Sequence, residues 1–86
     1  MKIWGKIVSC NKIQRDIIID YPDMLPSMIT NWDEVIGDIC QALDLSRPVV
    51  LIKNIAELQA FYHTTFKAND FMEHINFDQL TISVLI

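Results

Sequence analysis

Residues Lys2–Asp20, KIWGKIVSCNKIQRDIIID, contain two apolar runs on either side of one polar turn. Lys2–Ser9 and Ile13–Asp20 are rich in isoleucine and valine, which favour strands. Cys10–Lys12 between them is typical of a tight connection, and Asn11 tolerates the left-handed conformation that such a turn needs. The sequence therefore predicts an N-terminal β-hairpin.

Charged residues on the two strands set the expected register of this hairpin. A two-residue turn would place Lys6 opposite Arg15, and like charges facing each other across a sheet are unfavourable. A three-residue loop at Cys10–Lys12 places Lys6 opposite Asp16 instead, so we expect that loop. This register collects five isoleucines on one face, with Arg15 at its edge: Ile3, Ile7, Ile13, Ile17 and Ile19.

An amphipathic helix is expected after a connection that contains two prolines. Asn31 followed by Glu34 resembles a capping box, which marks a helix start. Pro48 forces the helix to end by Arg47, and Gly37 falls on its polar side. Apolar residues recur three and four positions apart along one stripe: Trp32, Val35, Ile36, Ile39, Cys40 and Leu43.

The second half of the chain contains three more predicted elements. Val49–Ile52 is a short apolar run that we expect to form a buried strand. Asn54–Glu57 repeats the capping pattern before a helix that should reach Thr64, and Gln79–Ile86 alternates as a half-buried strand does. With 86 residues there is room for one domain. We therefore predict a single α+β domain, residues 1–86, of order ββαβαβ, with helices packed on a mostly antiparallel sheet.

Composition and charge exclude several classes of protein. The chain is 51% hydrophobic with only two glycines and three prolines, which excludes a disordered chain. Its apolar runs are far shorter than the roughly 20 residues of a membrane span, and no apolar leader is visible, so we expect a cytoplasmic protein without membrane association. The net charge of −4 includes an acidic, base-free stretch at 16–46, which argues against nucleic-acid binding.

Sequence motifs for catalysis or cofactor binding are missing. The glycines, Gly5 and Gly37, stand too far apart for a phosphate-binding loop or a nucleophile elbow. His63 and His74 do not stand at a zinc-binding spacing, so no metal or cofactor is expected. Cys10 and Cys40 are expected to be free thiols, since the chain shows no secretion signal. We therefore assign no catalytic residue and predict a non-enzymatic protein.

One candidate binding site is a polar rim of three residues, Arg47, His63 and Asp70. The three side chains could meet if the predicted short strand and the second helix are neighbours. Such a rim would suit a small anionic ligand or a partner protein. The alternative is that these residues only cap helices and carry surface charge.

A second candidate is an apolar patch of Trp4, Val8 and Ile18, with Leu85, on the sheet face opposite the first helix. A contiguous exposed apolar patch usually marks an interface, and the commonest solution is a two-fold dimer. The alternative is a three-layer monomer in which the second helix covers that face.

Several strings resemble a group of small uncharacterised bacterial proteins. The similar strings are LDLSRPV at 43–49, KN at 53–54, FYHTTF at 61–66 and NDFMEHINFDQLTI at 69–82, with WGKI at 4–7 and RD at 15–16 in the hairpin. The resemblance implies a compact, single-domain bacterial protein. It supplies no activity, cofactor or catalytic residue.

Three functions therefore stay open. The first is a non-enzymatic protein that acts through protein contacts, as a homodimer or with a partner. The second is a ligand-binding protein or enzyme that uses the Arg47/His63 rim. The third is an acidic mimic of nucleic acid. That last function requires a one-sided array of Asp16, Asp20, Asp23, Asp33, Asp38 and Asp44.

Overall fold

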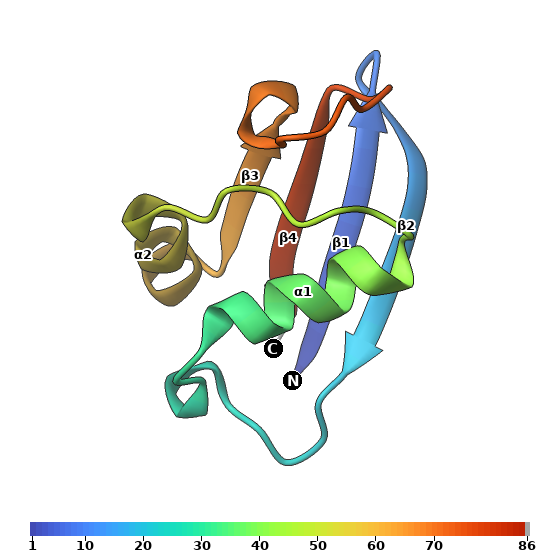
Figure 1. Ribbon diagram of the computed structural model, residues 1–86. Coiled ribbons are helices and arrows are strands. Elements are labelled where there is room, and N and C mark those ends of the chain that lie inside the picture. The colour runs from blue at the N-terminus through green and yellow to red at the C-terminus, as the bar shows by residue number, and fades with distance from the viewer. Residues whose placement is uncertain (86) are drawn as a thin grey trace.

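Four strands and two α-helices make up the computed structural model, which describes residues 1–85 (Figure 1). The elements are β1 (Lys2–Ser9), β2 (Lys12–Asp20), the 3₁₀ turn η1 (Pro26–Met28), α1 (Trp32–Ala42), α2 (Ile52–Phe61), β3 (His63–Lys67), the 3₁₀ turn η2 (Ala68–Asp70) and β4 (Gln79–Leu85). The predicted α+β class is confirmed. The predicted C-terminal strand is confirmed up to Leu85, and Ile86 lies outside the described residues.

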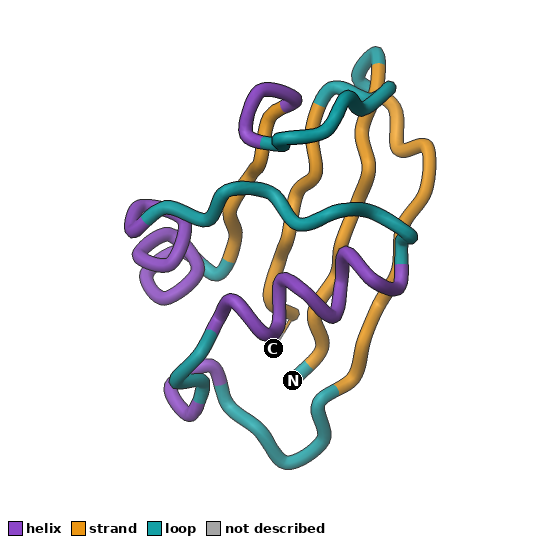
Figure 2. Tube along the Cα trace, in the orientation of Figure 1, coloured by secondary structure: helices purple, strands orange, loops and turns teal. Residues whose placement is uncertain are grey.

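The sheet has the strand order β2-β1-β4-β3, and every neighbouring pair is antiparallel. The last strand in the chain, β4, inserts between the first strand and β3. Both helices lie on the same face of this sheet, with α1 crossing in front of β1 and β4 and α2 beside β3 (Figures 1 and 2). The three-layer alternative, with the second helix on the opposite face, is therefore wrong.

The predicted strand at Val49–Ile52 is wrong. Only Pro48 pairs here, in an isolated bridge with Phe71, and the Val49 N–H donates to the carbonyl oxygen of Asp70 at 2.7 Å. Proline has no N–H to continue a ladder, so the pairing stops at one bridge. The segment 43–51 instead runs back across the helix-covered face to α2 (Figure 2).

Strand β3 begins at residues that were predicted to form the end of the second helix. The helix ends at Phe61 because Tyr62 adopts the left-handed conformation, with φ 61°. Such a residue commonly closes a helix. The β-branched pair Thr64 and Thr65 then favours an extended chain, which pairs with β4. The observed order is ββααββ rather than ββαβαβ.

The hairpin has the predicted register over its open end but not the predicted loop. Lys6 faces Asp16, as expected from the charges. The turn has two residues, Cys10 and Asn11, with φ of 53° and 62°. Two successive left-handed residues suit a two-residue hairpin turn, because they match the right-handed twist of the strands.

A bulge in β2 absorbs the extra residue that a three-residue loop would have held. Ile7 pairs with Arg15 whereas Val8 pairs with Ile13, so Gln14 is left without a partner in β1. The bulge reverses the alternation of side chains beyond it. Ile13 consequently faces away from the helices and is 53% exposed, and its predicted place beside the other four isoleucines is wrong.

The main core lies between α1 and the sheet. The predicted α1 stripe is confirmed, since Trp32, Val35, Ile36, Ile39, Cys40 and Leu43 are all buried. The N-cap Asn31 makes no side-chain hydrogen bond, so the predicted capping box is wrong. Gly37, predicted on the polar side of the helix, is buried because the guanidinium of Arg47 lies over it.

A buried polar chain joins α2 to β3. Asn54 is the third residue of α2, not its cap, and its Oδ1 accepts a hydrogen bond from the Leu51 N–H at 2.9 Å. Its Nδ2 donates to Thr64 Oγ1 at 2.9 Å, and that hydroxyl donates to Glu57 Oε1 at 2.7 Å. Asn54 and Thr64 are both buried, so the bonds replace those that water would make.

We expect Thr64→Val to lower the free energy of unfolding by about 1–3 kcal/mol, because Asn54 Nδ2 would lose its acceptor inside the protein. Thr65→Val is the matched control, since that hydroxyl lies half-buried on the opposite face, 3.3 Å from Thr81 Oγ1. The control should change stability by less than about 0.5 kcal/mol. Urea denaturation followed by circular dichroism measures both, and equal midpoints would contradict a structural role for the chain.

Candidate interaction surface

The sheet face that carries no helix is the candidate functional site, and we call it the open face. Residues paired directly across an antiparallel sheet share a face, so the register identifies its members. They are Lys2, Trp4, Lys6 and Val8 on β1; Ile13, Asp16, Ile18 and Asp20 on β2; Gln79, Thr81, Ser83 and Leu85 on β4; and His63, Thr65 and Lys67 on β3.

Apolar side chains gather on the β1–β2 half of the open face. Trp4 faces Ile18 and Val8 faces Ile13. Both isoleucines are 53% exposed, and Leu85 on β4 is 37% exposed. The structure thus places Trp4, Val8 and Ile18 on one face of the sheet, as predicted. Ile13 was not predicted on this face, since nothing in the local sequence indicates the bulge that turns its side chain there.

The indole of Trp4 is held in place by its polar neighbours. Its Nε1 donates to Asp16 Oδ2 at 2.8 Å. Lys6 Nζ lies 4.1 Å from the ring centroid, a cation–π arrangement. A tryptophan held on both sides loses little side-chain entropy when a partner packs against it, so it is suited to anchor an interface.

Charges of both signs lie among the apolar side chains of the open face. Lys2 faces Asp20 and Lys6 faces Asp16, and Lys67 adds a third base on β3. The remaining positions on β3 and β4 are mostly small hydroxyl residues. The Lys6–Asp16 pair lies between the Trp4–Ile18 and Val8–Ile13 pairs, close to the β2 edge of the sheet. The surface therefore mixes apolar and charged groups, as protein interfaces commonly do.

The proposed rim of Arg47, His63 and Asp70 is not assembled in the structure. Arg47 extends along α1, where its Nη1 donates to the Asp33 carbonyl oxygen at 3.4 Å. His63 begins β3 on the open face, whereas Asp70 follows the other end of that strand and accepts from the Lys67 N–H at 2.9 Å. Four residues of strand, about 13 Å, separate these two ends.

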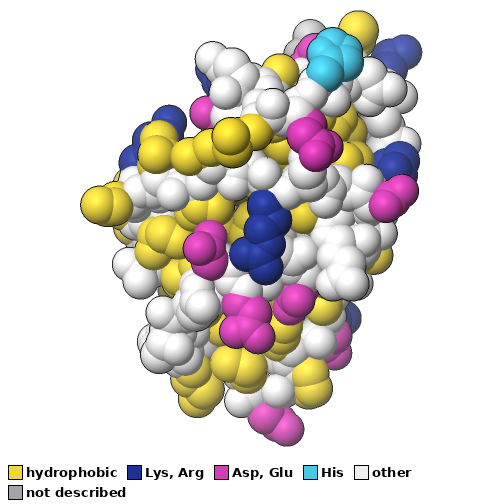
Figure 3. Space-filling model, in the orientation of Figure 1, with side chains coloured by type: hydrophobic (Ala, Val, Ile, Leu, Met, Phe, Trp, Pro, Cys, Tyr) yellow, Lys and Arg dark blue, Asp and Glu magenta, His cyan; other side chains and the backbone are white. Residues whose placement is uncertain are grey.

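The acidic residues do not form a one-sided array either. Asp16 and Asp20 lie on the open face, while Asp33 and Asp38 belong to α1 on the other side of the sheet. On the helix-covered side, acidic side chains border a basic one near the centre, and apolar side chains gather over α2 and the segment before it (Figure 3). This separation of the carboxylates across two faces does not favour the nucleic-acid mimic.

Both cysteines are free thiols in different surroundings. Cys40 is buried in α1, and burial raises the pKa of its thiol to about 11, with the charge of Arg47 acting in the opposite direction. Cys40 is therefore protonated at neutral pH and is a core residue, not a nucleophile. Cys10 lies exposed in the hairpin turn, where its N–H donates to Asp78 Oδ2 at 2.8 Å.

Within residues 1–85, no three His, Cys, Asp or Glu side chains are grouped so that they could hold a metal ion. No helix in that range has the length and apolar character needed to cross a membrane. No protein-family model, curated protein sequence or solved structure matches this chain.

Proposed function

We propose that this protein is a non-enzymatic interaction domain that pairs with a second copy of itself through the open face. The observation that carries the proposal is the cluster of Trp4, Val8, Ile13 and Ile18 on a sheet face that no helix covers. Burying these side chains removes apolar surface from water, which is the main driving force of association.

A second copy is the occupant that the charges favour. A two-fold dimer brings the same surface to itself, so each charged group must find its opposite on the same face. The open face meets this requirement, since Lys2 and Lys6 of one copy can approach Asp16 and Asp20 of the other. A strongly acidic or basic partner would leave one of these two sets facing a like charge.

The size of the open face predicts a weak dimer. Strands of about seven residues, rising about 3.3 Å each and spaced about 4.8 Å apart, give a four-stranded face of roughly 23 by 19 Å. Two such faces bury on the order of 1,000 Å² together, which is near the lower limit for specific interfaces. We therefore expect a micromolar dissociation constant rather than a permanent dimer.

Sedimentation of the wild type at about 100 µM should show a dimer that dissociates on dilution. Ile18→Lys and Trp4→Lys should each give a folded monomer, because the new charge would be buried against the partner. Ile18 is the cleaner position, since its side chain is 53% exposed within one copy.

Ile52→Lys is the matched control for these variants. Ile52 is 89% exposed at the start of α2, on the other side of the sheet, so this change should leave the dimer intact. A wild type that stays monomeric at about 100 µM, or an Ile18→Lys variant that still dimerises, would overturn the proposal.

We also propose that the protein is cytoplasmic in a bacterium and that it does not bind nucleic acid. The bacterial setting follows from the resemblance of the strings at 43–49 and 61–66 to small bacterial proteins. The net charge of −4 supports the absence of a nucleic-acid partner, because such partners bind basic faces.

A further inference from the structure

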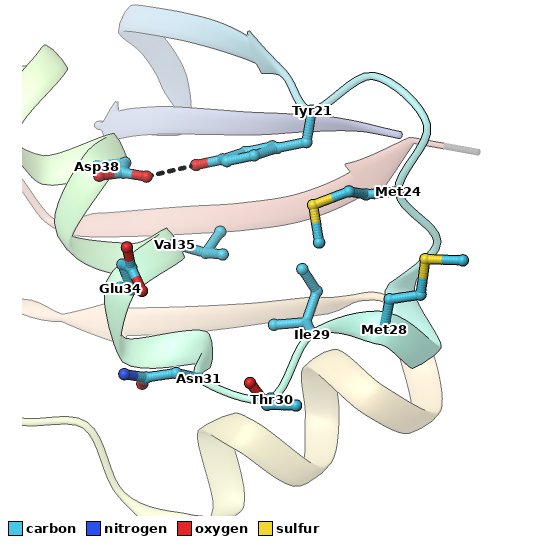
Figure 4. A pocket seen from close by; sticks show the side chains of 9 residues that line it. All are labelled: Tyr21, Met24, Met28, Ile29, Thr30, Asn31, Glu34, Val35 and Asp38. Atoms are coloured by element: carbon cyan, nitrogen blue, oxygen red, sulfur yellow. Dashed lines mark hydrogen bonds between the residues drawn. The ribbon is translucent and has the colours of Figure 1, made fainter.

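A pocket on the helix-covered side of the molecule is separate from the open face. It lies between the segment that follows β2, the turn η1 and the first turns of α1 (Figure 4). Its volume is about 290 Å³, which suits a fragment-sized molecule. Because α1 and the open face lie on opposite sides of the sheet, binding in this pocket does not depend on the proposed dimer.

One part of the pocket is apolar and adaptable. The side chains of Met24, Ile29 and Val35 point toward the same space, beside the ring of Tyr21 (Figure 4). A methionine side chain has three rotatable bonds and a polarisable sulfur, so it can adjust to ligands of different shape. This part of the pocket would accept the hydrocarbon portion of a ligand.

The opposite wall carries two carboxylates from one helix. Glu34 and Asp38 stand four residues apart on α1, so they project from the same side of it. Asp38 Oδ2 accepts a hydrogen bond from the hydroxyl of Tyr21 at 2.8 Å. Burial, and then the hydrogen bond and charge of Asp38, raise the pKa of the Tyr21 hydroxyl, so it remains a neutral donor that holds Asp38 at the pocket.

No basic side chain lines this pocket among residues 1–85. Arg47 extends along α1, but its Nη1 donates to the backbone oxygen of Asp33. The Met1 ammonium donates to the carbonyl oxygens of Tyr21 and Met24, at 2.9 and 3.0 Å. The two carboxylates therefore face an apolar pocket that contains no cationic side chain of its own.

We propose that this pocket binds a small organic ammonium, with its hydrocarbon body against Met24, Ile29 and Val35 and its charged nitrogen at Glu34 and Asp38. The N–H groups of an ammonium donate charge-assisted hydrogen bonds to carboxylates. A neutral molecule of the same shape would bury its body equally but would gain no such bonds. A divalent metal ion is a poorer match, since it would leave the apolar side chains of Met24, Ile29 and Val35 without a contact.

The test compares 2-phenylethylamine with the neutral 2-phenylethanol by titration into the ¹⁵N-labelled protein. The amine should bind with a millimolar dissociation constant, as expected for a fragment, and the alcohol at least about tenfold more weakly. The chemical-shift changes should be confined to the 21–38 segment and its neighbours. Equal binding of the two probes, no binding of the amine, or shift changes elsewhere would overturn the proposal.

Variants of the carboxylates provide the second arm of the test. Glu34→Gln and Asp38→Asn should each weaken amine binding by about tenfold, and both keep an oxygen acceptor, so the spectrum of the free protein should stay folded. Asp44→Asn is the matched control, because Asp44 is an exposed acid just beyond α1 that does not line the pocket. Unchanged binding in both carboxylate variants, or an equal loss in the control, would overturn the proposal.

Discussion

Ile39→Asp should leave the chain unfolded under conditions in which the wild type is folded. Ile39 is fully buried in the middle of α1, against β1. The change removes a large apolar side chain from the core and replaces it with a carboxylate that has no partner there. The combined loss, about 5 kcal/mol or more, equals the whole stability of many small domains.

Gln41→Asp is the matched control, since it adds the same charge to an exposed position of the same helix. It should lower the free energy of unfolding by less than about 1 kcal/mol, through the lower helix propensity of aspartate and its position near the helix C-terminus. Urea denaturation followed by circular dichroism compares the two. A cooperative transition for Ile39→Asp at a midpoint similar to that of the control would show that α1 does not pack through this face.

Gly5→Val should lower the free energy of unfolding by about 3 kcal/mol or more. Gly5 lies in β1 directly beneath α1, and a Cβ added there would lie 2.5 Å from Ile39 Cγ2. Neither group can move without displacing the strand or the helix, so the added atoms would force the two layers apart. Gly5→Ala should also lower the free energy of unfolding, by a smaller amount.

Gly37→Ala is the informative contrast with Gly5. An added Cβ at Gly37 would meet only the guanidinium of Arg47, which is the far end of a flexible side chain. Arg47 can swing aside, and alanine gains about 1 kcal/mol of helix propensity over glycine. We therefore expect a change between zero and a small increase in stability.

A double-mutant cycle tests the contact at Gly5 directly. Gly5→Ala should be less damaging in an Ile39→Ala background, because Ile39 Cγ2, the atom that clashes, is absent. Thermal and urea denaturation of the four proteins measure the coupling. Additive losses would mean that α1 does not approach β1 as closely as the structure has it.

The hairpin shows how far local sequence reasoning reaches. The charges of Lys6 and Asp16 predict their pairing, because that pairing depends on two neighbouring strands and nothing else. The same charges are compatible with two ways of holding the extra residue, a longer loop or a bulge. In the structure, the left-handed residues Cys10 and Asn11 complete a two-residue turn. The extra residue is therefore accommodated by the bulge in β2, which turns Ile13 to the open face.

The candidate sites were predictable to different degrees. Trp4, Val8 and Ile18 could be placed on one face because alternation along a strand is a local property. The rim of Arg47, His63 and Asp70 depended on a strand that does not form. The pocket beside α1 had no signal in the sequence, because its walls come from Tyr21, η1 and α1, segments whose relative positions depend on packing.

The hairpin strands, α1 and the alternating strand β4 could be predicted from local sequence, because the spacing of apolar residues specifies which face of each element avoids water. The other features of the fold required long-range packing. Three features depend on partners distant in sequence: the insertion of β4 between β1 and β3, the burial of Asn54 against Thr64, and the strand that begins at His63, where a helix was predicted to reach Thr64. Buried backbone groups at these positions need hydrogen-bond partners, and those partners come from strands that are distant in sequence. This requirement outweighs the local preference of the residues for helix or strand.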